Sequence, residues 1–129
     1  IEILEANKEF VCGRMPVDKR TIQPYGLLHG GASVAFAESL GIFAGSMHIN
    51  WENEAVVGIE INANHLKSVR SGWVFGKASP QKIGGKIHVW NIDITNEDEE
   101  LICVSRLTLA VINHKRIMKS KKMKETTNE

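Results

Sequence analysis

One stretch of this chain, residues 30–47, is small or apolar at nearly every position and carries a single charged residue, Glu38. With eighteen residues, several of them glycine or serine, and a glutamate near its centre, it does not have the composition of a membrane span. We therefore expect a buried helix inside a globular domain. Apolar side chains occur on all sides of the predicted helix axis, which is typical of a helix that is enclosed on every side.

Glu38 needs a physical reason to lie in such a helix. An ionised carboxylate that is removed from water is costly unless it is paired or hydrogen-bonded. Carboxylates in apolar surroundings are therefore over-represented where chemistry is done. The residues alone leave two interpretations open: Glu38 is a catalytic group, or it is a structural carboxylate capped by neighbouring backbone amides.

After Trp51 the pattern of apolar residues changes to a period of two, which predicts strands. The expected strands span residues 54–65, 72–79, 86–95 and 101–113, and residues 1–15 can supply one or two more. A glycine pair at 84–85 and an acidic loop at 96–100 favour antiparallel hairpins. The sum is an α+β fold, one long helix on an antiparallel sheet, in a single domain of residues 1–113.

Charge is unevenly distributed along the chain. The net charge is +1, but residues 114–129 hold six of the sixteen Lys and Arg residues, so residues 1–113 carry ten basic and thirteen acidic side chains. A nucleic-acid-binding protein would carry its basic surface on the folded body, so that class is excluded. We expect the tail to be a flexible, solvated C-terminus, with a membrane-surface or partner-binding segment as the alternative.

The two cysteines indicate the compartment. Cys12 and Cys103 lie far apart in the sequence and form no CxxC pattern. We expect two reduced thiols in a cytoplasmic protein, with a disulfide as the alternative, and no metal site.

Four segments carry a resemblance to a known family. They are residues 15–21 (MPVDKRT), 23–41 (QPYGLLHGGASVAFAESLG), 58–70 (GIEINANHLKSVR) and 104–108 (VSRLT). These segments resemble the hotdog-fold acyl-CoA thioesterases, and among them the 4-hydroxybenzoyl-CoA and 1,4-dihydroxy-2-naphthoyl-CoA thioesterases. The resemblance implies a sheet wrapped around a central helix, a homodimer with a continuous sheet that often forms a dimer of dimers, and active sites at the dimer interface.

The resemblance also implies roles for individual residues. Glu38 would be the nucleophile or general base, and Gln23 would contribute its amide beside the backbone N–H of Gly30, from the other subunit. Helix N-termini bind developing anions well, which gives Gly30 a physical basis as an oxyanion donor. Gln23 could instead order its loop. His29 is a second-tier candidate, either as a general acid or thioester contact or as a brace at the helix entrance.

Coenzyme A is part of the expected substrate, so no separate cofactor is predicted. Candidates for binding its charged nucleotide are basic or glycine positions, with ordinary solvated charge as the alternative: His65, Lys67, Arg70, Gly84, Gly85 and Arg106. Ile42 departs from the family pattern, because relatives commonly have Ser or Thr one helical turn after the catalytic Glu. This difference predicts slower turnover or a more apolar acyl pocket.

The expected function is hydrolysis of an aromatic or medium-sized acyl-CoA ester to the free acid and coenzyme A. Hydrolysis of 1,4-dihydroxy-2-naphthoyl-CoA in menaquinone synthesis is one candidate. Two alternatives stay open: a hotdog hydratase or dehydratase in which His29 and Glu38 form an acid–base pair, and a non-catalytic acyl-CoA-binding module. Spacing does not select the acyl group, because the implied pocket is assembled from two subunits.

Overall fold

The computed structural model describes residues 1–113. Its elements are, in chain order, strands β1 (Glu2–Ala6) and β2 (Val11–Val17), helix α1 (Gly30–Ser46), and strands β3 (Glu54–His65), β4 (Gly72–Ile83), β5 (Ile87–Thr95) and β6 (Leu101–Asn113). The basic tail predicted for residues 114–129 lies outside the described residues.

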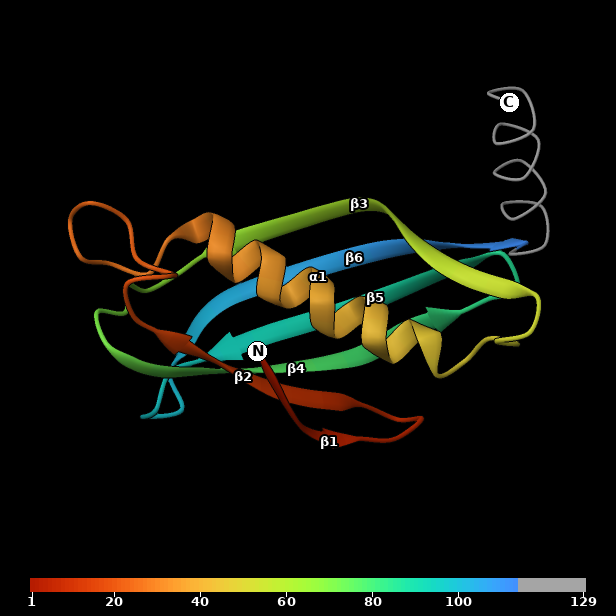
Figure 1. The fold of residues 1–129 in the computed structure, drawn as a ribbon, viewed down its shortest axis with the longest axis horizontal. Coiled ribbons are helices and arrows are strands. Elements are labelled where there is room, and N and C mark those ends of the chain that lie inside the picture. Colours follow the sequence, from red (N-terminus) through yellow and green to blue (C-terminus); the bar gives the residue numbers. More distant parts are fainter. Residues whose placement is uncertain (114–129) are drawn as a thin grey trace, which may run out of the picture.

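The six strands form one antiparallel sheet in the order β1-β2-β4-β5-β6-β3, and α1 lies across one of its faces (Figure 1). The long strand β3 follows the helix in the chain but pairs only with β6, so it forms an edge of the sheet. The predicted α+β arrangement of one helix on an antiparallel sheet is confirmed.

Most strand boundaries agree with those predicted from the period-two pattern. β4 is the exception, because it continues past the expected end at residue 79 to Ile83. The register shifts between Pro80 and Lys82, and such a bulge accommodates a proline that cannot donate a ladder hydrogen bond. Residues 1–17 supply both β1 and β2.

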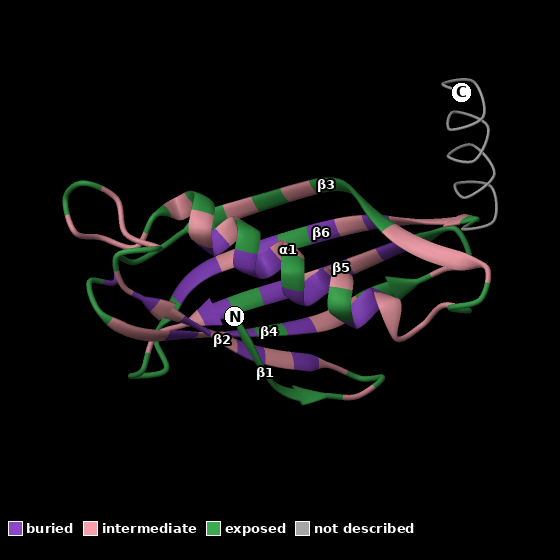
Figure 2. Ribbon diagram, in the orientation of Figure 1, coloured by how far each residue is buried: buried purple, intermediate pink, exposed green. Residues whose placement is uncertain are grey.

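The hydrophobic core lies between the helix and the middle of the sheet. Figure 2 shows buried residues on β2, β4, β5 and β6 and on the side of α1 that faces them, whereas the edge strands are more exposed. The largest fully buried side chains are Trp90, Phe36 and Leu40. Burial alternates strictly along β2, as the period of two requires.

The prediction of a helix enclosed on every side is wrong for the single chain. Phe36 and Leu40 are fully buried, but Phe43 on the same helix is 41% exposed. The reason is that one chain provides a single sheet layer, which covers one side of α1 only. None of the helices in residues 1–113 is long and apolar enough to cross a membrane.

Two glycines allow α1 to approach the sheet closely. A methyl group at Gly41 on the helix would lie 2.4 Å from Leu107 Cδ2, and one at Gly76 on β4 would lie 2.4 Å from Leu40 Cδ1. Both distances are far below van der Waals contact, so leucine side chains occupy the space that a larger residue would need.

The two cysteines are free thiols, in agreement with the prediction. Burial raises the pKa of both Cys12 and Cys103 above the ordinary value, which keeps the thiols protonated.

The buried His88 on β5 predicts a loss of stability in mild acid. Burial lowers its pKa below 6.5, nearby His48 lowers it further, and Glu54 opposes both. The imidazole thus stays neutral in the folded chain, whereas the unfolded chain takes up a proton below about pH 6.5. The free energy of unfolding should therefore fall as the pH drops below about 6.5.

Urea unfolding at pH 7.5 and 5.5 measures this effect, and His88→Gln should reduce the difference between the two values. Trp90 Nε1 donates to His88 Nδ1, and the two nitrogen atoms are 3.5 Å apart; glutamine also carries a side-chain acceptor for this proton. An equal pH dependence in the wild type and the variant would exclude His88 as the source.

Candidate functional site

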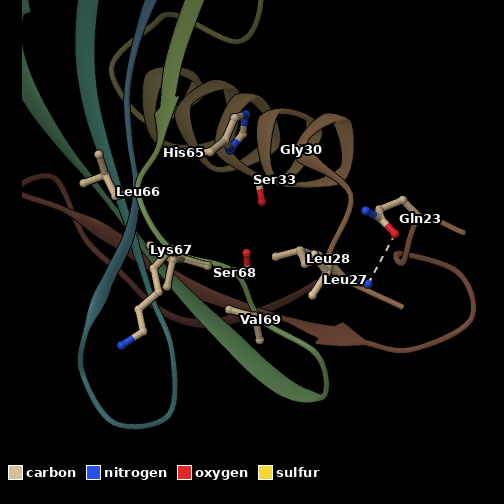
Figure 3. Close-up of a pocket in the computed structure, with 11 residues that line it drawn as sticks. Gln23, Leu27, Leu28, Gly30, Ser33, His65, Leu66, Lys67, Ser68 and Val69 are labelled. Atoms are coloured by element: carbon tan, nitrogen blue, oxygen red, sulfur yellow. Dashed lines mark hydrogen bonds between the residues drawn. The ribbon is translucent and has the colours of Figure 1, made fainter. Parts of the chain in front are cut away.

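A pocket of about 420 Å³ lies at the N-terminal end of α1 (Figure 3). Its walls come from the loop before the helix with the first turn of the helix, from the end of β3 with the chain that follows it, and from the start of β6. The pocket is lined by Gln23, Leu27, Leu28, Gly30, Ser33, His65, Leu66, Lys67, Ser68, Val69 and Ile102. Gln23 and Gly30, predicted to act together, therefore face the same space.

A tight turn holds the Gln23 side chain in place. Its backbone bonds to Leu27 and Gly26, and Gly26 has φ +82°, a conformation that glycine adopts readily. The Gln23 Oε1 atom accepts hydrogen bonds from the backbone N–H groups of Tyr25 and Leu27. This leaves the amide nitrogen pointing toward the pocket (Figure 3). Gln23 thus orders the loop with its oxygen and presents its N–H donors to the pocket.

In the first turn of α1, every backbone N–H group except one donates a hydrogen bond. Gly31 N–H donates to His29 Nδ1 at 2.8 Å, and the N–H groups of Ala32 and Ser33 donate to the His29 carbonyl. Of the four N–H groups at this helix end, only Gly30 N–H has no partner within residues 1–113. A donor at the positive end of a helix is a ready site for a carbonyl oxygen that develops negative charge.

His29 is the N-cap residue of α1, exposed to solvent, and its ring accepts a hydrogen bond through Nδ1. A neutral ring that accepts at Nδ1 carries its proton on Nε2. The geometry supports the predicted bracing role of His29 directly.

Two of the predicted coenzyme A contacts line the pocket. The His65 ring packs over Gly30, where a methyl group would lie 3.0 Å from His65 Nε2. Lys67 forms an ion pair with Glu100 at the rim, and this pair lowers the pKa of Glu100. A phosphate at this rim would therefore share the Lys67 ammonium with a carboxylate.

The other four predicted contacts lie elsewhere in the chain. Arg70 borders a smaller pocket of about 220 Å³ beside the acidic loop 96–98. Arg106 is exposed on the sheet face away from the helix, where its Nε donates to Asn91 Oδ1 at 3.3 Å. Gly84 and Gly85 form the β4–β5 turn, at the opposite end of the sheet from Gly30.

Glu38 lies two helical turns beyond Gly30 and does not line this pocket. It is partly buried over the edge strand, and a methyl group at Gly58 of β3 would lie 3.4 Å from Glu38 Oε2. Its carboxylate forms no hydrogen bond or ion pair with any described residue. The interpretation of Glu38 as a carboxylate capped by backbone amides is therefore wrong for the described chain.

Ile42, one turn after Glu38, is partly buried and packs against the hydrophobic core. Ile42 thus makes apolar contacts at the position where the family pattern predicts a hydroxyl group.

The pocket also contains residues that the sequence interpretation missed, notably Ser33 and Ser68. Ser33 lies three residues after Gly30, and this spacing places both on one side of a helix. That spacing was the available signal for Ser33. Ser68 had none, because its position depends on how the chain after β3 folds over the helix start.

Comparison with known proteins identifies the family. The model of the thioesterase superfamily matches residues 25–103. The chain belongs to the thioesterase superfamily. The 1,4-dihydroxy-2-naphthoyl-CoA hydrolase of Escherichia coli is 53% identical over 98 residues, which are 76% of this chain and 71% of that protein.

Solved structures of thioesterases share the fold. A thioesterase from Haemophilus influenzae is 54% identical, with a TM-score of 0.83 over 87% of this chain and 78% of that one. A thioesterase from Staphylococcus aureus is 36% identical, with a TM-score of 0.84 over 85% of this chain and 91% of that one. One structure of the latter protein has alanine in place of a glutamate, and a second has alanine in place of a glutamine. The two substituted positions are fifteen residues apart, which is also the separation of Gln23 and Glu38 in this chain.

Family membership and these structures confirm the predicted hotdog thioesterase fold and the prediction of a thioester hydrolase. In this thioesterase the described pocket joins a helix end, a loop amide and two hydroxyls, while the carboxylate lies apart from them.

Proposed function

We propose that this thioesterase hydrolyses aromatic or medium-sized acyl-CoA esters, with 1,4-dihydroxy-2-naphthoyl-CoA as the first substrate to test. The name of the Escherichia coli relative supports that choice. The pocket volume of about 420 Å³ and its leucine and valine walls suit a compact apolar acyl group.

One observation carries the proposal. Gly30, whose N–H has no partner within residues 1–113, lines the pocket, and the amide nitrogen of Gln23 points toward it. A thioester carbonyl oxygen placed between them accepts two hydrogen bonds, which strengthen as the oxygen becomes negative. Loss of one such donor costs about 10²- to 10³-fold in kcat in other enzymes.

Glu38 supplies the other half of the reaction. As a general base, its carboxylate takes a proton from water as the water oxygen attacks the carbonyl carbon; the C–S bond then breaks, and the leaving coenzyme A thiolate takes the proton from the carboxyl group. As a nucleophile, it attacks the carbonyl carbon and displaces the coenzyme A thiolate to form an anhydride, which water hydrolyses to the free acid and the regenerated carboxylate. A carboxylate without a hydrogen-bond partner suits both roles.

A single chain cannot bring these groups to one carbonyl. Gly30 and Glu38 are eight residues apart, which is about 12 Å along a helix, whereas reacting atoms approach to about 3–3.5 Å. The edge strand β3 offers a way to join two copies, since its outer edge is unpaired in the described chain and Val57 and Ile59 are exposed on it.

A two-fold axis makes β3 pair antiparallel with its copy. Within one chain Gly30 lies beside His65 and Glu38 lies beside Gly58. Pairing about a point between Gly58 and His65 moves the partner's Glu38 toward Gly30. The same pairing brings the partner's β4–β5 turn to the end of the dimer that holds His65, where its glycines can meet coenzyme A. We expect dimers to associate further into a dimer of dimers.

The two free cysteines support a reducing compartment, the cytoplasm, as the site of the reaction.

Subunit mixing tests the shared site. Gln23→Ala and Glu38→Ala should each lose thiol release from acyl-CoA esters. After the two proteins are dissociated and re-formed together, activity should return to about a quarter of the wild-type level, because half of the random dimers are mixed and each mixed dimer has one intact site. Native mass spectrometry confirms that mixed dimers form. Mixed dimers without activity would contradict a site built from two subunits.

A further inference from the structure

Ser33 differs from the other helix serines. Ser39 and Ser46 donate their hydroxyl protons to the carbonyls of Ala35 and Phe43, at 2.8 and 2.6 Å. Ser33 is only 2% exposed, yet its hydroxyl has no hydrogen-bond partner in the described part of the chain. Its oxygen points into the pocket, toward the oxygen of Ser68 on the opposite wall (Figure 3).

Such a hydroxyl discriminates between ligands. In the empty pocket, water can satisfy it. A bound acyl group that displaces this water leaves the hydroxyl either paired with the ligand or unpaired, and an unpaired buried hydroxyl costs about 1–3 kcal/mol. Sites with such groups favour ligands that carry the matching polar atom over isosteric ligands that lack it.

We propose that Ser33 is a specificity-determining residue, whose hydroxyl binds a hydroxyl or other hydrogen-bonding substituent on the acyl group. This inference rests on the proposed function. Ser33 lies about 4.5 Å along the helix from Gly30, so a thioester whose carbonyl is bound at Gly30 has its acyl group beside Ser33.

Ser68 completes the contact from the other wall. It is exposed, and its hydroxyl is likewise without a partner among residues 1–113. A substituent hydroxyl donates one hydrogen bond and accepts others, so it can bind both serines at once. Leu27, Leu28 and Val69 line the pocket alongside this pair, and the polar side chains of Gln23, His65 and Lys67 line other parts of it.

The experiment compares kcat/KM for benzoyl-CoA and its 2-, 3- and 4-hydroxy derivatives. We expect the wild type to prefer at least one hydroxylated ester over benzoyl-CoA by about tenfold or more. Ser33→Ala should lower kcat/KM for that ester by about tenfold more than it lowers kcat/KM for benzoyl-CoA. Ser33→Thr, which keeps the hydroxyl, should retain the preference.

Ser46→Ala is the matched control, since it removes a hydroxyl at the other end of the same helix. An equal loss for all four esters in Ser33→Ala would show a structural role only, and an unchanged preference would show no role; either result overturns the proposal. If Ser33→Ala does not fold, the exposed Ser68→Ala must shift the preference, and its failure to do so is equally decisive.

The proposed function fails in a different way. A wild-type protein that hydrolyses neither these four esters nor 1,4-dihydroxy-2-naphthoyl-CoA contradicts acyl-CoA hydrolysis itself, and the specificity proposal falls with it. A wild type that hydrolyses all four equally, in a reaction that depends on Glu38, contradicts the role of Ser33 alone.

Discussion

Glu38→Ala is expected to lower kcat for acyl-CoA hydrolysis by about 10³-fold or more, because in the proposed mechanism this carboxylate attacks the carbonyl or activates water. The substitution should leave the fold intact, since the carboxylate is only partly buried and forms no hydrogen bond to a described residue. Release of free thiol from benzoyl-type CoA esters measures the activity, and size-exclusion chromatography measures the oligomer.

Glu9→Ala is the control, an exposed glutamate in the β1–β2 turn that should have wild-type turnover. Unchanged turnover in Glu38→Ala would remove this residue from the mechanism. Single-turnover hydrolysis in isotopically labelled water separates its two roles. Label that enters the Glu38 carboxylate supports a covalent anhydride, whereas label found only in the released acid supports a general base.

Phe36→Ala is expected to lower the free energy of unfolding by about 3–5 kcal/mol. Phe36 is fully buried between α1 and β4, close enough to Gly76 that a methyl group there would lie 3.1 Å from its ring. Because the packed neighbours can relax only in part, truncation leaves a cavity. Urea unfolding at a fixed protein concentration measures the loss.

Tyr25→Ala provides the comparison. It removes an aromatic ring of similar size that is 84% exposed, and we expect a change of less than about 0.5 kcal/mol. Equal effects of the two substitutions would mean that the described core does not carry the stability of the chain.

The architecture could largely be predicted from local pattern. The period of two after Trp51 identified β3, β4, β5 and β6, because side chains of a strand alternate between faces wherever one face is buried. The covering of the helix could not be predicted in this way. The apolar residues on all sides of α1 predicted a fully enclosed helix, but one chain supplies a single sheet layer, so Phe43 on the uncovered side is exposed.

Some residues of the candidate site could also be identified from the sequence, and others could not. The helix end at Gly30 had a physical basis in the sequence, and Glu38 stood out as the single charge in an apolar helix. The role of Gln23, and the choice of a catalytic over a structural role for Glu38, depended on the family resemblance. Arg106 could have been placed by alternation, since its neighbours Ser105 and Leu107 are buried and it must face the other side of the sheet.

The Ser33–Ser68 pair could be identified only from the structure. Its two members lie on segments that are separated by β3 and meet only when the chain after that strand crosses the helix start. The periodicity of a single helix or strand does not predict that residues on two such segments lie close together.

The close packing of α1 against the sheet at Gly41 and Gly76 affects how the enzyme can evolve. At Gly41 and Gly76 even one added methyl group would overlap a buried leucine, so we expect substitutions there to destabilise the fold whatever the substrate is. In the segments that form the pocket walls, Gln23 and Gly26 are constrained by their turn, whereas exposed positions such as Leu66 and Ser68 are not tightly packed. Descendants of one ancestral enzyme can therefore acquire new acyl preferences by changing such exposed positions, while the helix that bears the carboxylate keeps its position.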